Sequence, residues 1–214
     1  MRFFLENLPT LKNLIPNSDL KISAVIFGIF KNENSTFDFL LTKRSPKLKS
    51  HSGQLSFPGG KADKEDESIL KTALREWEEE LGESTEHLEI LTELDGLETG
   101  TGYHITPFLA EYKGNHAFSI NPNEVESIYR IPFQDLENSP FYSVNFSQIL
   151  NPIDPRKRIH YFQLKEGLLW GATCEIILQF LQNYSDFKRK PISVFPNIDR
   201  PPFFNPSENF QFDK

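Results

Sequence analysis

The order of apolar and polar positions along the chain predicts several strands and two helices. Residues 21–30 are a nearly unbroken run rich in Ile, Val and Phe, typical of a strand buried on both faces. A polar turn at 32–35 separates this run from residues 36–42, which we expect to form its hairpin partner. Further strands are predicted at 88–94, 103–112, 125–131 and 160–164. This mixture of strands and helices indicates a layered α/β domain.

The clearer of the two predicted helices covers residues 67–81. Its apolar side chains recur at every fourth position, which places them in one buried stripe: Ile69, Ala73, Trp77 and Leu81. Either Asp66 or Ser68 could cap the start of this helix, and Gly82 is expected to end it. The second predicted helix is an amphipathic segment at 168–181.

The 214 residues suit one domain with extensions at both ends. We expect an irregular or partly helical lead-in at 1–20, the domain at 21–185, and an extended tail at 186–214 that is rich in Pro and Phe. Residues 137–157 form a long connection rich in Asn, Ser and Pro. Three roles of the tail stay open: ordinary packing, a cover over a pocket, and a contact within a homodimer.

Composition limits the partners and the compartment. The single cysteine, Cys174, argues against a disulfide framework and fits a reducing compartment. No apolar run is long enough to cross a membrane, and the first residues do not resemble a signal peptide, so we expect a cytoplasmic protein. A net charge of −7 and a pI near 5.3 argue against nucleic acid or a membrane surface as a partner.

Charge is distributed unevenly along the chain. Residues 63–83 carry nine acidic and three basic side chains. Just upstream, residues 43–51 carry four Lys or Arg side chains and no acid. Such clusters are often only solvated surface, but an acidic cluster beside a basic one also fits a site for a metal ion and an anionic substrate.

Three carboxylates of the acidic cluster share one face of the predicted helix. Glu76 and Glu80 are one helical turn apart, and Glu79 lies beside them. Like charges at this spacing destabilise a bare helix by about 0.2–0.5 kcal/mol per pair, so these groups favour a compensating cation. Hard divalent ions such as Mg²⁺ take oxygen ligands of this kind. Arg75 precedes Glu79 by four residues and can pair with it.

Segments 57–61 (Phe-Pro-Gly-Gly-Lys) and 75–82 (Arg-Glu-Trp-Glu-Glu-Glu-Leu-Gly) resemble the Nudix box, the signature of Nudix hydrolases. The resemblance implies an α/β/α sandwich with a mixed sheet, and hydrolysis of a diphosphate bond. Two departures are visible. The spacing from Gly60 to Glu67 is one residue longer than the general pattern, and Glu83 stands where an apolar residue is usual.

Outside the box, four segments are similar to landmarks of the coenzyme A diphosphatase subgroup: 40–60, 101–107, 123–132 and 160–173. This resemblance implies hydrolysis of coenzyme A to 3′,5′-ADP and 4′-phosphopantetheine. Two alternatives stay open: a Nudix hydrolase for ADP-ribose, a dinucleotide or another nucleoside diphosphate derivative, and a non-catalytic module that binds a nucleotide. The complete set of box carboxylates argues against the second alternative.

The resemblance also implies roles for individual residues. Mg²⁺ or Mn²⁺ is expected to be held by Glu76, Glu79, Glu80 and the carbonyl of Gly60. The catalytic residues it implies are Arg75, Glu76, Glu79 and Glu124. Of these, Glu76 is the first choice for orienting or deprotonating the water, Glu124 is the alternative outside the box, and Arg75 orients a carboxylate.

Substrate phosphates are expected to meet basic side chains close to the box. The candidates are Lys43, Arg44, Lys47, Lys49, His51 and Lys61. Tyr103 and His104 follow a Gly-rich turn, and they could line the pocket or serve a structural role.

Overall fold

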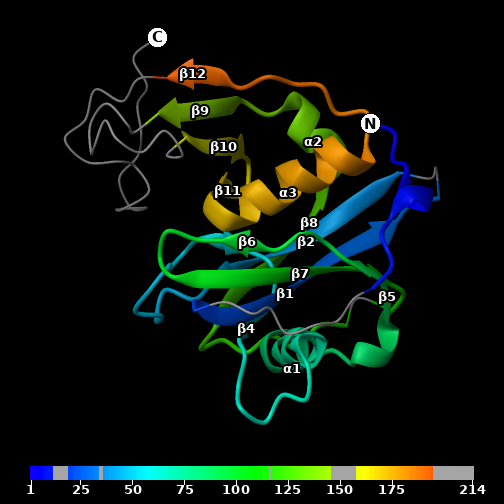
Figure 1. Ribbon diagram of the computed structural model, residues 1–214, viewed down its shortest axis with the longest axis vertical. Helices are drawn as coiled ribbons and strands as arrows, with labels where there is room; N and C mark the ends of the chain where they lie inside the picture. The colour runs from blue at the N-terminus through cyan, green and yellow to red at the C-terminus, as the bar shows by residue number, and fades with distance from the viewer. Residues whose placement is uncertain (12–18, 34–35, 116, 146–157, 195–214) are drawn as a thin grey trace.

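The computed structural model describes residues 1–11, 19–33, 36–115, 117–145 and 158–194 (Figure 1). Its main sheet is mixed, as predicted. The strands with the order β3-β2-β1-β7-β5 are Leu55–Ser56, Phe37–Arg44, Lys21–Lys31, Tyr103–Tyr112 and Leu88–Glu93. Three strands lie off this path: β4 (Gly59–Lys61) pairs with β1, β6 (Leu97–Glu98) with β7, and β8 (Val125–Pro132) with β2.

Helices cover the two faces of the main sheet, which gives the α/β/α arrangement (Figure 1). On one face, α1 (Ile69–Leu81) packs its apolar stripe against β1 and β7. On the other face, α3 (Gly171–Tyr184) packs against Phe27, Phe39 and Leu109. Because side chains of β1 enter both cores, its sequence shows a continuous apolar run rather than alternation.

The boundaries of α1 follow local capping chemistry. The Ser68 side chain accepts a hydrogen bond from the backbone N–H of Lys71, which makes Ser68 rather than Asp66 the N-cap. Gly82 ends the helix with a left-handed φ of 59°, as predicted. All four residues of the predicted stripe are at most 1% exposed. Burial of this stripe fixes which side of the helix carries the carboxylates.

The second helix starts later than the sequence suggests. Residues Gly167–Trp170 form strand β11, which pairs with β10 (Arg158–Leu164), and α3 begins only at Gly171. The prediction of a helix from residue 168 was therefore wrong. A short apolar run reads equally well as strand or helix, and pairing with β10 decides for the strand.

The region 137–157, expected to be a long connection, contains regular structure. It includes the C-terminal part of α2 (Phe133–Asn138) and all of β9 (Phe141–Asn145), while residues 146–157 lie outside the described residues. A second sheet has the order β11-β10-β9-β12, and β12 (Ile192–Val194) comes from the predicted tail. The last part of that tail, residues 195–214, also lies outside the described residues.

The N-terminal lead-in contains one 3-10 turn at Leu5–Asn7 and attaches to the domain through its backbone. The N–H of Phe4 donates to the carbonyl of Tyr184, and the Phe3 ring packs among Phe37, Phe133 and Phe180. None of the described helices has the length and hydropathy needed to cross a bilayer.

Candidate active site

Arg75 joins the start of α1 to the loop before it. Its guanidinium donates from Nε and Nη2 to the two carboxylate oxygens of Asp66, at 3.0 and 3.1 Å, and from Nη2 to the carbonyl of Lys61 at 3.0 Å. The hydrogen bonds from Arg75 are the main reason that the pKa of Asp66 falls to about 2. The same pairing raises the pKa of Arg75. The arginine is therefore a fixed cation at the edge of the site.

Asp66 occupies the position that the sequence pattern assigns to Glu67. Asp66 is bound to Arg75 and its side chain is 8% exposed, whereas Glu67 is exposed. Five residues separate Gly60 from Asp66, as in the general box, so the additional residue lies between this acid and Arg75. Counted to Glu67 the loop is one residue longer than in the general box, but the acid that pairs with Arg75 is Asp66. The five-residue spacing after Gly60 could have identified Asp66 as the partner of Arg75. The pattern has Glu at this position, however, and the neighbouring Glu67 matched it by residue type.

Asp66→Asn is expected to lower the free energy of unfolding by about 2 kcal/mol at neutral pH, because it removes a carboxylate whose pKa is depressed in the folded state. The stabilisation by Asp66 is complete above its unfolded pKa near 3.8 and is lost as pH falls through about 2. The free energies of unfolding of the wild type and Asp66→Asn should therefore become equal in acid. Urea titrations of both proteins at a series of pH values from neutral downward would measure this.

Asp63→Asn is the matched control for this prediction. The Asp63 carboxylate lies 3.6 Å from Nη2 of Arg75 but is 64% exposed, so its loss should cost no more than about 0.5 kcal/mol. Equal losses in the two variants, or a difference that does not shrink in acid, would contradict the central role given to Asp66.

Two carboxylates of α1 are held by the same nitrogen of Arg75. Nη1 donates to Oε1 of Glu76 at 3.0 Å and to Oε2 of Glu79 at 2.8 Å. The Glu79 pair is the contact expected from the sequence. Glu79 is 52% exposed, whereas Glu76 is only 15% exposed. Burial is the largest cause that raises the pKa of Glu76.

Gly60 is a glycine because Glu76 lies against it. A Cβ at residue 60 would come within 2.3 Å of Oε1 of Glu76. Gly60 pairs with Ala24 on β1, so the strand holds its backbone beside the carboxylate. The structure thus brings together Gly60 and Glu76 of the predicted metal-binding set.

Glu80 is the most buried acid of the site, with 4% exposure. Burial raises its pKa to about 8, and the carboxylates of Glu76 and Glu124 add to the rise, whereas the charge of Arg44 opposes it. Its Oε2 has no hydrogen-bond partner, although a buried carboxylate oxygen normally has one. This oxygen is therefore available to a cation.

Backbone contacts bring Glu124 and Arg44 to the same place. The N–H of Asn121 donates to the carbonyl of Glu80, and the N–H of Ser45 donates to the carbonyl of Glu124. The charges of Glu124 and Arg44 both act on Glu80, and Nε of Arg44 is buried without a partner. The acid outside the box thus lies beside the box carboxylates, although it is 44 positions from Glu80 in sequence.

These donors fit a divalent metal ion. The Glu80 oxygen without a partner, the partly buried Glu76 and the backbone of Gly60 supply hard oxygen donors of the kind that Mg²⁺ takes. Among the described residues, however, no three acidic, His or Cys side chains are already gathered as a metal cage. Instead, the Glu76 and Glu79 carboxylates accept hydrogen bonds from Arg75.

The basic side chains predicted to bind substrate do not form one cluster. Lys43 donates to Glu126 at 2.9 Å, which raises its pKa, and Lys47 donates to Asn123 at 3.2 Å. Lys49 and His51 are exposed, and the His51 ring bonds to Gln54. Arg44 differs from these residues, because its charge acts on the Glu80 carboxylate of the box.

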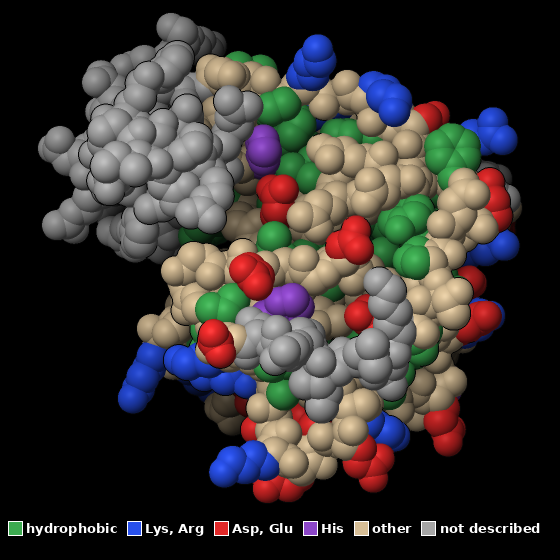
Figure 2. Space-filling model, viewed as in Figure 1, with side chains coloured by type: hydrophobic (Ala, Val, Ile, Leu, Met, Phe, Trp, Pro, Cys, Tyr) green, Lys and Arg blue, Asp and Glu red, His purple; other side chains and the backbone are tan. Residues whose placement is uncertain are grey.

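Lys61 lies on the face of the main sheet opposite to that of Arg44. Its Nζ lies over the ring of Tyr103, 5.6 Å from the centroid. Figure 2 shows Lys and Arg side chains gathered at the lower left of the molecule, near the end of the main sheet where β1 and β7 begin in Figure 1. Lys61 therefore lies next to Gly60 of the box, but its side chain is on the face of the sheet opposite to the Glu76 carboxylate.

The second departure from the box pattern has a local structural explanation. Glu83 is buried, accepts a hydrogen bond from the Tyr112 hydroxyl at 2.9 Å, and lies 2.5 Å from Nδ1 of His87. His87 belongs to the turn that follows α1, and Tyr112 is the last residue of β7. Glu83 therefore attaches the end of the helix to β7 and does not join the carboxylates of the site.

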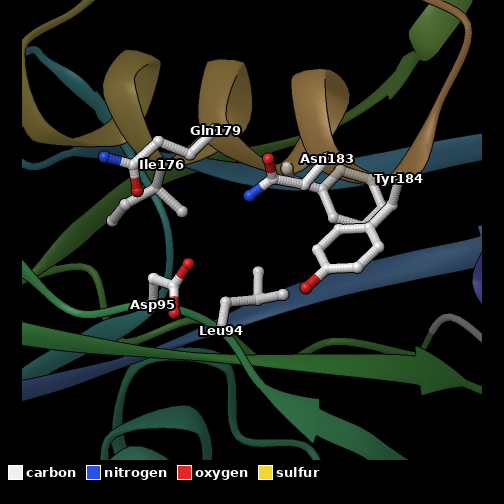
Figure 3. A pocket seen from close by; sticks show the side chains of 7 residues that line it. Leu94, Asp95, Ile176, Gln179, Asn183 and Tyr184 are labelled. Carbon is white, nitrogen blue, oxygen red and sulfur yellow. The ribbon is translucent and has the colours of Figure 1, made fainter. Parts of the chain in front are cut away.

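A small hollow lies on the other side of the main sheet, between α3 and the segment that follows β5 (Figure 3). Its lining consists of Leu94, Asp95, Ile176, Gln179, Phe180, Asn183 and Tyr184. Burial and the charge of Asp95 raise the pKa of Tyr184. None of the site residues predicted from the sequence lines this hollow, so it is separate from the acidic site.

Known relatives share most of the length of this chain. It is 35% identical over 182 residues to a protein of Photorhabdus laumondii named as an uncharacterized Nudix hydrolase, NudL, covering 85% of this chain and 93% of that protein. It is 33% identical over 190 residues to the NudL protein of Yersinia pestis strain Pestoides F, covering 86% and 92%.

A solved structure shares the fold. The MutT/nudix family protein from Enterococcus faecalis aligns with a TM-score of 0.50 and 14% identity, covering 80% of this chain and 64% of that protein. The family model for the NUDIX domain matches residues 19–156. This match includes the acidic helix, Arg75 and Glu124, and with the relatives it establishes that the chain is an enzyme of the Nudix hydrolase family.

Proposed function

We propose that this Nudix hydrolase cleaves the diphosphate bond of coenzyme A or its derivatives. Products of the reaction are 3′,5′-ADP and 4′-phosphopantetheine. Water attacks one phosphorus atom, its oxygen forms the new P–O bond, and the bridging P–O bond breaks. One proton passes from the water to a base, and the leaving phosphate takes up the bridging oxygen.

The observation that carries this proposal is the electrostatic interaction between Arg44 and Glu80. Arg44 belongs to the segment 40–60 that resembles the coenzyme A subgroup, and Glu80 belongs to the Nudix box. Both have a buried polar atom without a partner, and their opposite charges interact. A metal ion on Glu80 and a phosphate oxygen on Arg44 would satisfy both atoms.

A bound divalent ion would polarise the diphosphate and lower the pKa of a water molecule. Glu76, Glu79, Glu80 and the Gly60 carbonyl are the groups proposed to hold it, with Mg²⁺ or Mn²⁺ as the candidates. Burial raises the pKa of Glu76, which makes this carboxylate a stronger proton acceptor than an exposed glutamate. Glu124 is the second candidate, since its charge acts on both Glu76 and Glu80.

Product analysis tests this function. The protein is incubated with Mg²⁺ or Mn²⁺ and, in separate reactions, coenzyme A, an acyl-coenzyme A, ADP-ribose and NADH, and the products are resolved by chromatography. We expect fast, metal-dependent release of 3′,5′-ADP from coenzyme A. Fast turnover of ADP-ribose together with no turnover of coenzyme A would overturn the assignment of coenzyme A as the substrate. Loss of all turnover in excess chelator would confirm that the reaction depends on the metal.

A further inference from the structure

Two lysines from different strands converge on one aromatic ring beside the active site. Nζ of Lys21 lies 5.5 Å and Nζ of Lys61 lies 5.6 Å from the centroid of the Tyr103 ring. Within the part of the chain that the structure describes, neither ammonium group forms an ion pair. Lys43, in contrast, is neutralised by Glu126.

Strand pairing places all three side chains on one face of the main sheet. Lys21 pairs with Tyr103 across the parallel strands β1 and β7, and Lys61 of β4 pairs with Ser23. Paired residues, and residues two positions apart on one strand, point to the same face. The convergence is therefore set by the backbone, although each lysine tip remains exposed.

This arrangement leaves positive charge without compensation. An aromatic ring attracts a cation only modestly at an exposed site, and two ammonium groups near one ring repel each other. An anion bound by both ammonium groups would be attracted by each of them and would offset their mutual repulsion. A phosphate suits the pair, because lysine ammonium groups act as flexible point charges toward phosphate oxygens.

β4 connects this basic pair to the box. Gly60 contacts the Glu76 carboxylate on one face, while the next residue, Lys61, directs its side chain to the other face. The carbonyl of Lys61 also accepts a hydrogen bond from Arg75. A phosphate bound by the two lysines would thus lie on one side of β4, and the diphosphate at the box would lie on the other side. A substrate that carries both a diphosphate and a separate phosphate could occupy the two positions at once.

We propose that Lys21, Lys61 and Tyr103 form an anion subsite that binds the ribose 3′-phosphate of the substrate. The proposal rests on the proposed function, since coenzyme A carries this phosphate in addition to its diphosphate. In this subsite the lysines contact the phosphate, and Tyr103 is a positioning residue that holds the two stems together. The subsite selects substrate and takes no part in bond cleavage.

The test compares coenzyme A with dephospho-coenzyme A, which lacks only the 3′-phosphate. Lys21→Met and Lys61→Met should each lower kcat/KM for coenzyme A about tenfold more than for dephospho-coenzyme A, through KM, because each removes one charge-assisted contact. Lys21→Arg should keep the preference for coenzyme A. Equal losses on the two substrates, or no loss on either, would overturn the subsite.

Lys64→Met is the matched control, since Lys64 is an exposed lysine of the loop between β4 and α1, and the cations that lie over the Tyr103 ring are those of Lys21 and Lys61. It should leave the ratio of the two kcat/KM values as it is in the wild type. A shift of the ratio as large as that of Lys21→Met would show that general surface charge, rather than a subsite, sets the preference.

A binding measurement separates this inference from the proposed function. If the wild type does not cleave coenzyme A, the proposed function fails, and the subsite is judged by calorimetric titration with 3′,5′-ADP and 5′-AMP in the absence of metal. Wild type should bind 3′,5′-ADP more tightly than 5′-AMP, and the double variant Lys21→Met/Lys61→Met should bind both about equally. Wild-type affinities that are equal, or a preference unchanged in the double variant, would reject the subsite.

Discussion

Glu80→Gln is expected to lower kcat about a thousandfold while the protein stays folded, because it removes the buried anionic oxygen that faces the proposed metal site. The measurement is turnover against Mg²⁺ concentration, with the largest loss at low Mg²⁺. Glu78→Gln makes the same charge change on the exposed side of α1, where Glu78 accepts a hydrogen bond from Thr85. This control should keep wild-type turnover, and wild-type turnover in Glu80→Gln would contradict the assignment.

Stability measurements show whether a loss of turnover comes from unfolding. Burial raises the pKa of Glu80 from 4.5 to about 8 in the folded state, so ionisation of this group opposes folding. Without metal, wild-type stability from this group should fall as pH rises from 4.5 and level off above 8. Glu80→Gln lacks this penalty, so the metal-free variant should be at least as stable as wild type at pH 8 and above.

Gly60→Ala is expected to lower kcat about a hundredfold with little loss of stability, since a displacement of about 1 Å in a reacting group can have this effect. The added Cβ meets the end of the flexible Glu76 side chain, at 2.3 Å from Oε1, so the carboxylate moves and the backbone stays. Turnover and thermal unfolding measured together would reveal this combination.

Gly59→Ala provides the contrasting control. Its Cβ would meet the carbonyl oxygen of Ala24 at 2.3 Å and Cα of Val25 at 2.6 Å, and Gly59 has a φ of 152° that other residues rarely adopt. Here the backbone itself must shift, so we expect a large loss of stability. If Gly60→Ala lost stability as Gly59→Ala does, the contact with Glu76 would not be the reason for glycine at residue 60.

The parts of the fold predicted correctly are those with strong local signals. A four-residue apolar period and two capping residues defined α1, and long β-branched and aromatic runs defined β1 and β7. The errors lie where strand pairing decides the outcome. The segment Gly167–Trp170 is too short and too apolar to distinguish strand from helix, and β12 exists only because β9 lies beside it.

The sequence by itself determined the family, the helix and the shared face of Glu76, Glu79 and Glu80, because helical periodicity relates residues that are close in the chain. Tertiary structure decided the partners of those residues. It chose Asp66 over Glu67 for Arg75, placed Glu124 and Arg44 beside Glu80, and divided the basic residues between two faces of the sheet. These outcomes depend on strand register and on burial, which relate residues far apart in the chain and leave no periodic pattern in the sequence.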